Sequence, residues 1–143
     1  MDATELLARQ HRELLAVFDE LEFTRDAIER TRLMGRVAER LKVHAALEEG
    51  VFYPALCEAA PDEVEDALAA HRALDVLLDE TVGNPSAANA KILRWLVAQH
   101  FDDEEHRLFA AVEQLNEAGA AALASRLERY ARVVDEEGPT SDA

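Results

Sequence analysis

Four histidines and three carboxylates recur at matched spacings along the chain, and residues of these types could bind metal ions. Three of the histidines are followed four residues later by a carboxylate. On a helix, residues four apart lie on one face, so each pair can aim both side chains at one point. Imidazole and carboxylate are natural ligands of transition-metal ions. The candidate ligands are His11, His44, Glu48, His71, Asp75, His100 and Glu104.

These residues interrupt four apolar stripes whose 4-3 spacing is typical of helices in an antiparallel bundle. Counted at about 1.5 Å of rise per residue, they fall into one slab a couple of turns thick. No Lys or Arg shares the stripes at that level, and burying unpaired carboxylates costs several kcal/mol each. A multivalent cation would neutralise them. The pattern therefore favours a metal site over a metal-free polar core.

The helices that must position these side chains are predicted from apolar periodicity and from breakers such as Gly83-Asn84-Pro85-Ser86. We expect helices over about 3–22, 31–58, 62–82, 87–115 and 120–134, with Pro54 kinking the second. The expected stripe of the third helix is Val64, Leu68, His71, Asp75, Leu78 and Val82.

The predicted fold class is all-α, an antiparallel up-down-up-down four-helix bundle with an additional C-terminal helix. The expected organisation is a bundle over 1–116, a C-terminal helix over 117–135 that packs on the bundle or on a partner, and a disordered acidic tail over 136–143.

The chain also contains an internal repeat. The segment around His11 is similar to the segment around His71, at an offset of 60 residues. The segment 44–49 is similar to 100–105, at an offset of 56 residues. The chain is therefore predicted to consist of two similar helical hairpins related by an approximate two-fold axis.

Taken together, these motifs resemble the hemerythrin-like family, also called the HHE cation-binding domain, over about residues 5–115. The family motif is a His on the first helix, His-x3-Glu on the second, one or two His on the third, and His-x3-Glu or His-x4-Asp on the fourth. The resemblance implies a di-iron centre with histidines as terminal ligands and with Glu48 and Glu104 as bridges. Oxygen-carrying members have a second His at the position of Asp75, so the carrier role is in doubt.

Several assignments stay open at this point. Asp75 is expected to be a ligand, with a hydrogen-bonding role to a ligating imidazole as the alternative. Glu105 could replace Glu104 as a bridge, because it has the His-x4-acid spacing. Tyr53 is expected to be a core or rim aromatic, with a hydrogen bond near the metal as the alternative.

Composition and net charge exclude several classes of partner. The net charge is -15, from 30 acidic and 15 basic residues, which disfavours nucleic acid and anionic membranes as partners. No apolar run approaches membrane-spanning length, and the single Cys57 excludes an internal disulfide. We expect a soluble, cytoplasmic protein that is a monomer or a homodimer.

The expected function is a non-haem di-iron protein that binds or reacts with dioxygen, peroxide or nitric oxide, for sensing, detoxification or oxidation. Peroxidase-like or oxidase-like activity is compatible with this expectation. The alternatives are non-enzymatic iron binding or storage, oxygen carriage, and a metal-independent helical interaction module. Manganese and zinc are rival occupants of the site.

Overall fold

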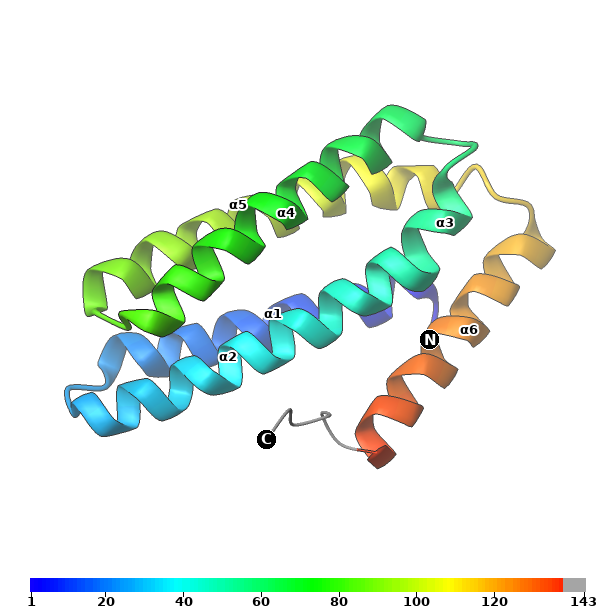
Figure 1. Ribbon diagram of the computed structural model, residues 1–143. Helices are drawn as coiled ribbons and strands as arrows, with labels where there is room; N and C mark the ends of the chain where they lie inside the picture. Colours follow the sequence, from blue (N-terminus) through cyan, green and yellow to red (C-terminus); the bar gives the residue numbers. More distant parts are fainter. Residues whose placement is uncertain (138–143) are drawn as a thin grey trace.

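The computed structural model describes residues 1–137, and these residues form helices and turns without a strand (Figure 1). The elements are α1 (Ala3–Phe23), α2 (Ala27–Leu47), the π-helical segment η1 (Glu48–Phe52), α3 (Tyr53–Leu56), α4 (Pro61–Gly83), α5 (Ala87–Val112) and α6 (Glu117–Glu137). The all-helical prediction is therefore confirmed. Of the predicted tail 136–143, the first two residues belong to α6 and the others lie outside the described residues.

Local side-chain chemistry explains where the helices begin. Asp2 caps α1 by accepting the Glu5 backbone N–H at 2.8 Å, and Glu5 completes the capping box. Ser86 caps α5 in the same way. Asp26 caps α2, which therefore begins at Ala27, four residues earlier than predicted, because no Gly or Pro marks this turn.

Four long helices pack around one interior. α1 contacts α2 and α5, and α4 contacts α5 and α2, so the four form a closed ring (Figure 1). The α1–α2 and α4–α5 turns lie at the same end of the molecule, and α6 crosses near the other end. α6 packs against α1, α2 and η1, and its Leu123 and Leu127 are buried in the interior.

Two apolar clusters fill the interior, one on each side of the predicted polar slab. The turn-side cluster contains Leu14, Phe18, Met34, Val37, Leu78, Leu93, Val97 and Phe101 among others. The α6-side cluster contains Leu7, Leu47, Phe52, Tyr53, Leu56, Val64, Leu108, Leu123 and Leu127 among others. Burial of apolar surface on both sides holds the polar residues between them at a fixed depth.

The predicted second helix is interrupted by a π-helical turn. The backbone N–H of Tyr53 bonds to the carbonyl of Glu48, five residues earlier, instead of four. Pro54 follows immediately, and a proline ring in a regular helix clashes with the carbonyl four residues before it. The wider turn relieves this clash and rotates the residues after it relative to those before it.

The inward face of α4 differs from the predicted stripe. Its buried residues are Val64, Ala67, Leu78 and Thr81, whereas Val82 is 44% exposed and Asp75 is exposed. From Val64 onward, the residues that face inward are spaced alternately three and four apart. Leu74 therefore follows His71 on the inner face. The predicted phase was wrong by one residue at these positions, because both phases satisfy a 4-3 apolar pattern.

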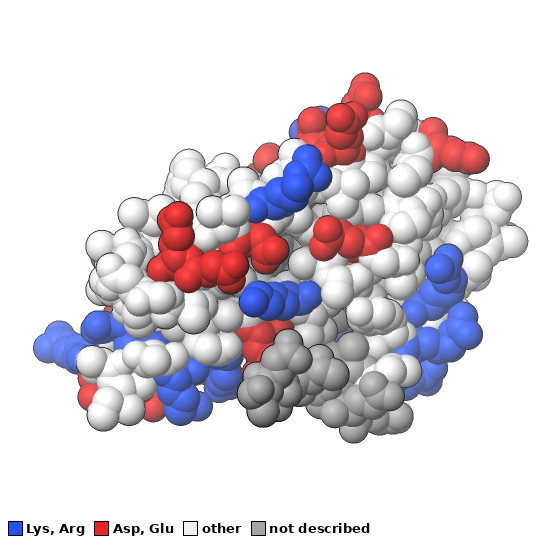
Figure 2. Space-filling model, in the orientation of Figure 1, with Lys and Arg blue, Asp and Glu red and all other residues white. Residues whose placement is uncertain are grey.

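The surface carries charges of both signs on the face shown in Figure 2, with basic side chains gathered where α1 turns into α2 and along α6. Among the described residues, no helix has the length and apolar character needed to cross a membrane.

Candidate metal centre

Six of the seven predicted ligands come together in the slab between the two apolar clusters. His11 lies on α1, His44 at the end of α2, Glu48 at the start of η1, and His71 on α4, while α5 carries the remaining two residues. They form two groups whose candidate ligand atoms lie within 4.8 Å of one another. The first group is His11, His44, Glu48 and Glu104, and the second is Glu48, His71, His100 and Glu104.

Within each group, two imidazole rings approach through their Nε2 atoms. His11 and His44 are 3.1 Å apart at Nε2, and His71 and His100 are 3.0 Å apart. Two ligand atoms at about 2.1 Å from one ion and at right angles lie about 3.0 Å apart. The spacing of each pair therefore fits two neighbouring positions in the coordination sphere of one ion.

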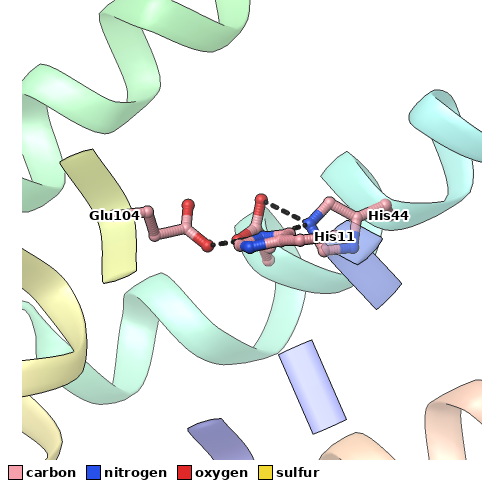
Figure 3. Close-up of side chains that lie close together, drawn as sticks. His11, His44 and Glu104 are labelled. Atoms are coloured by element: carbon pink, nitrogen blue, oxygen red, sulfur yellow. Dashed lines mark hydrogen bonds and ion pairs between the residues drawn. The ribbon is translucent and has the colours of Figure 1, made fainter. Parts of the chain in front are cut away.

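Each buried glutamate contacts one imidazole from each group. Glu48 Oε1 lies 3.3 Å from Nε2 of both His44 and His71. The Glu104 oxygens lie 3.4 Å from His11 Nε2 and 3.5 Å from His100 Nε2. Figure 3 shows the His11 and His44 rings and the Glu104 carboxylate pointing toward one another. Both carboxylates are thus shared between the two groups.

The ring nitrogens on the far side of three imidazoles face polar partners. His44 Nδ1 lies 2.7 Å from Gln10 Oε1, and His11 Nδ1 lies 3.3 Å from Glu105 Oε2. His71 Nδ1 lies 3.5 Å from Glu49 Oε2, an ion-pair distance longer than a good hydrogen bond. A carboxylate or amide on this nitrogen directs the other nitrogen into the site. Glu105 is placed as such a partner, and Glu104 occupies the shared position.

Tyr53 contacts the site, although the sequence favoured a role as a core or rim aromatic. Its hydroxyl donates to Glu104 Oε2 at 2.7 Å and lies 3.4 Å from Glu48 Oε1 and 3.0 Å from His71 Nε2. The side chain is fully buried. In a regular helix, Tyr53 and Glu48, five residues apart, would point to different sides. The π-helical turn brings them to the same side, and Pro54 is a sequence signal for this turn.

Burial and mutual repulsion set the charges of the two glutamates. The pKa of Glu104 is well above its ordinary value, because the carboxyl is buried and faces the charge of Glu48. Burial also acts to raise the pKa of Glu48, but the nearby His44 and hydrogen bonds outweigh it and bring that pKa well below its ordinary value. The two pKa values are therefore displaced in opposite directions, so a proton on this pair resides on Glu104 in preference to Glu48.

Burial favours the neutral, metal-binding form of two of the imidazoles, His11 and His100. Burial lowers the pKa of His11 to about 3, assisted by the neighbouring His44, and lowers the pKa of His100 to about 4. Neutral imidazole is the ligating form. Burial acts in the same direction on His71, but its hydrogen bond to Glu48 and the charges of Glu48 and Glu49 outweigh it and raise the pKa.

The donor set fits a cation. Glu48 Oε2 and Glu104 Oε1 are buried, and neither accepts a hydrogen bond from the described residues. Leaving such oxygens without a partner costs roughly 1–3 kcal/mol each, and more when they are charged. Both atoms lie beside His11 Nε2, at 4.0 and 3.4 Å. A metal ion between these atoms would satisfy them, and a purely structural role leaves their burial unexplained.

The seventh predicted ligand, Asp75, is placed elsewhere. Its side chain is exposed and lines a cavity beside the site together with His71, outside both four-residue groups. The one-residue change of phase on α4 accounts for this position, because Leu74 instead of Asp75 follows His71 on the inner face.

Comparison with known families agrees with this geometry. The family model for the hemerythrin HHE cation binding domain matches residues 2–89, which include His11, His44, Glu48 and His71. No curated protein and no solved structure matches the chain. His100 and Glu104 lie beyond the matched segment, so their place in the site rests on the structure.

Proposed function

Since the chain belongs to the hemerythrin HHE cation-binding family, we propose that it binds two iron ions and reacts with dioxygen, peroxide or nitric oxide. The observation that carries this proposal is the pair of buried four-residue groups sharing Glu48 and Glu104. His11 and His44 would hold one ion, and His71 and His100 the other. Bound iron would supply one-electron chemistry toward these small oxidants.

The chain's own residues support a dinuclear site over a mononuclear one. Each group offers two imidazoles, and a single ion cannot contact the imidazoles of both groups while the glutamates lie between them. The carboxylates are buried between two apolar clusters, and this low-polarity setting strengthens their electrostatic attraction to a cation. We further infer an up-down-up-down helix order, because α1–α2 and α4–α5 pack together across short turns.

The balance of ligands favours reaction over reversible oxygen carriage. Each ion would have two imidazoles and two shared carboxylates, a harder and more anionic set than one richer in histidine. Such a set stabilises the higher oxidation state of iron. We therefore place oxidation, detoxification or sensing ahead of transport.

The deciding experiment is metal stoichiometry combined with an optical spectrum. The metal-free chain is loaded anaerobically with ferrous iron, assayed for iron per chain and exposed to air. About two irons per chain, with near-ultraviolet bands typical of oxo-bridged ferric pairs, are expected. The double variant Glu48→Gln/Glu104→Gln should lose the second iron, and full retention of two irons would sink the bridge assignment.

A ligand role for Asp75 stays a prediction. In that role, Asp75→His would replace a hard donor by a softer one and slow the autoxidation of the ferrous site. Rapid-mixing absorbance after exposure to air measures this rate. The control is Val76→His, at a neighbouring position that is 62% exposed. Equal rates in wild type and Asp75→His would show that Asp75 is not a ligand.

A further inference from the structure

A cavity of about 50 Å³ between α4 and α5 connects two of the predicted ligands with the surface. Its inner end is formed by His100 and Glu104, which are 8% and 2% exposed. The rest of its lining is largely charged and includes Glu63, Asp66, Asp103 and Arg107. Three carboxylates and one guanidinium therefore lie between solvent and the buried ligands.

The internal repeat shows how this side of the site differs from its counterpart in the first hairpin, α1–α2. The residues that correspond to Glu63, Asp66 and Asp103 are, in that order, Ala3, Leu6 and Leu47. These three apolar residues are buried in the α6-side cluster, and α6 packs against the first hairpin (Figure 1). The site is thus covered by apolar packing on one hairpin and bordered by carboxylates on the other.

The repeat also accounts for the space at the inner end of the cavity. In the first hairpin, Gln10 Oε1 lies 2.7 Å from His44 Nδ1. The repeat relates His44 to His100 and Gln10 to Ala70, which lines the cavity and has no amide to offer. Among the described residues, His100 makes its hydrogen bond through Nε2 to His71, and none is made by its Nδ1. The absence of one amide therefore leaves both the space and an imidazole without an outer partner.

We propose that divalent metal ions enter and leave the site through this cavity, and that Asp66 and Asp103 are the first groups to receive the hydrated ion. The inference rests on the proposed metal-binding function and deepens it by assigning a route of exchange. Carboxylates at the mouth of a cleft raise the local concentration of cations and their rate of association. At the inner end, Glu104 Oε1 is buried and accepts no hydrogen bond from the described residues, so an entering cation would be drawn to it. The ion held by His71 and His100 should exchange first, because His100 lines the cavity.

The other cavity beside the site is a less favourable route for a cation. It lies between α2, α4 and α5, its walls are mainly apolar, and Lys42 lines it together with Asp75. A hydrated cation would lose water there without gaining carboxylates in exchange.

Arg107 regulates the proposed route. Its guanidinium lies 3.1 Å from Asp66 Oδ2 and thereby joins α5 to α4 beside the cavity. Both side chains are exposed, so the ion pair is weak and separates at little cost. Arg107 should slow the entry of a cation without preventing it.

The first test measures how fast metal enters. Cobalt(II), whose visible bands change on binding, is mixed rapidly and anaerobically with the metal-free full-length chain. At low ionic strength, Asp66→Asn/Asp103→Asn should take up cobalt about threefold more slowly or less, and added salt should shrink the difference by screening these charges. Arg107→Gln should take it up faster than wild type. The control Glu20→Gln/Glu39→Gln removes two exposed carboxylates from α1 and α2 and should keep the wild-type rate within about 1.5-fold.

The second test measures how fast metal leaves. Ala70→Gln supplies the amide that the repeat lacks and fills the cavity, so an excess of chelator should remove the first cobalt ion about fivefold more slowly than from wild type. Ala73→Gln, at an exposed position of the same helix, should release it at the wild-type rate.

Cobalt bound per chain at equilibrium separates the possible outcomes. Wild-type stoichiometry in every variant, with the expected changes in rate, would support the route. Wild-type stoichiometry with unchanged rates in Asp66→Asn/Asp103→Asn and in Ala70→Gln would overturn the route and leave the metal-binding function standing. Loss of bound cobalt in Asp66→Asn/Asp103→Asn would also overturn it, because these carboxylates would then be ligands. Failure of the wild type to bind cobalt or iron would overturn both proposals.

Discussion

At the scale of single residues, the site contains two buried carboxylates whose burial a bound cation would compensate. Glu48 and Glu104 are buried side by side, and their pKa values are displaced in opposite directions. Tyr53 donates a hydrogen bond to the one with the raised pKa. Two predictions follow at this scale: one concerns the stability of the metal-free protein, and the other its affinity for iron.

The first prediction concerns Glu104→Gln in the metal-free chain. A carboxyl whose folded pKa lies above its unfolded value of 4.5 contributes its full stability below that value and loses it as pH rises through the folded pKa. The amide stays neutral and can donate to Glu48. The variant should therefore gain about 1–3 kcal/mol near pH 7.5 and little near pH 4.5.

Urea unfolding at the two pH values measures this gain. The control is Glu113→Gln, which changes an exposed carboxylate on the surface after α5 and should leave the free energy of unfolding within about 0.5 kcal/mol. A Glu104→Gln variant less stable than wild type at both pH values would contradict the argument. The same variant should bind iron poorly, so stability and metal binding change in opposite directions.

The second prediction concerns Tyr53→Phe. Loss of the hydroxyl releases Glu104 from its 2.7 Å hydrogen bond, and outer partners of this kind typically contribute 10–100-fold to metal affinity. Competition with a chelator should show affinity for the second iron lowered by about tenfold or more. Phe109→Tyr, at the position that the repeat relates to Tyr53, serves as the matched control and should retain the wild-type affinity.

The same variant also distinguishes two roles of the hydroxyl. A phenolate bound to ferric iron absorbs in the visible range, whereas a phenol that only donates a hydrogen bond does not. A visible band in wild type that is absent in Tyr53→Phe would assign Tyr53 as a ligand. Wild-type iron affinity in Tyr53→Phe would contradict both roles.

At the scale of the elements, the π-helical turn and α6 determine the α6-side flank of the site. The turn contains one more residue than a regular helical turn, so Tyr53 lies on the same side as Glu48. Its hydroxyl is 3.4 Å from Glu48 Oε1. α6 contacts η1 and α1 and covers the apolar cluster to which Tyr53 belongs. The predicted C-terminal helix is thus packed within this chain, on the bundle.

The third prediction concerns how much the packing of α6 on the bundle contributes to the free energy of unfolding. Leu127 on α6 is completely buried, so Leu127→Ala should lower the free energy of unfolding by about 2–5 kcal/mol through lost burial and a cavity. Val133→Ala changes a residue of the same helix that is 49% exposed, and it should cost less than about 1 kcal/mol. Chemical denaturation of both variants gives the comparison, and equal losses would show that α6 does not cover the core as described.

At the scale of the whole molecule, metal binding and folding are coupled. The candidate ligands lie on α1, α2, η1, α4 and α5, so ions bound there would link all four long helices. A ligand that binds only the folded state stabilises it by RT ln(1 + [L]/Kd). Ions would also remove the repulsion between the two glutamates.

The fourth prediction follows from this coupling. Chelation of the loaded protein should lower the midpoint of thermal unfolding, and at free iron one hundred times the dissociation constant the lost stability is about 2.7 kcal/mol per site. Differential scanning calorimetry of loaded and chelated protein measures the difference. The double variant Glu48→Gln/Glu104→Gln should show no such shift, and an equal shift in that variant would place the stabilising metal elsewhere.

The sequence by itself determined the helical class, the internal repeat and six of the residues that come together in the site. These features depend on periodicity and on side-chain type, which are local properties of the chain. The family model covers residues 2–89 alone, yet the repeat had already related His100 and Glu104 to the matched pair His44 and Glu48.

Only the tertiary structure decided the remaining features, because each depends on the rotation of one helix relative to another. The phase of α4 brought Leu74 inward and left Asp75 exposed, although both fit an apolar 4-3 pattern. The π-helical turn brought Tyr53 onto the shared carboxylates. The cavity that His71 and Asp75 line is bounded by side chains of α2, α4 and α5, so it too is set by packing.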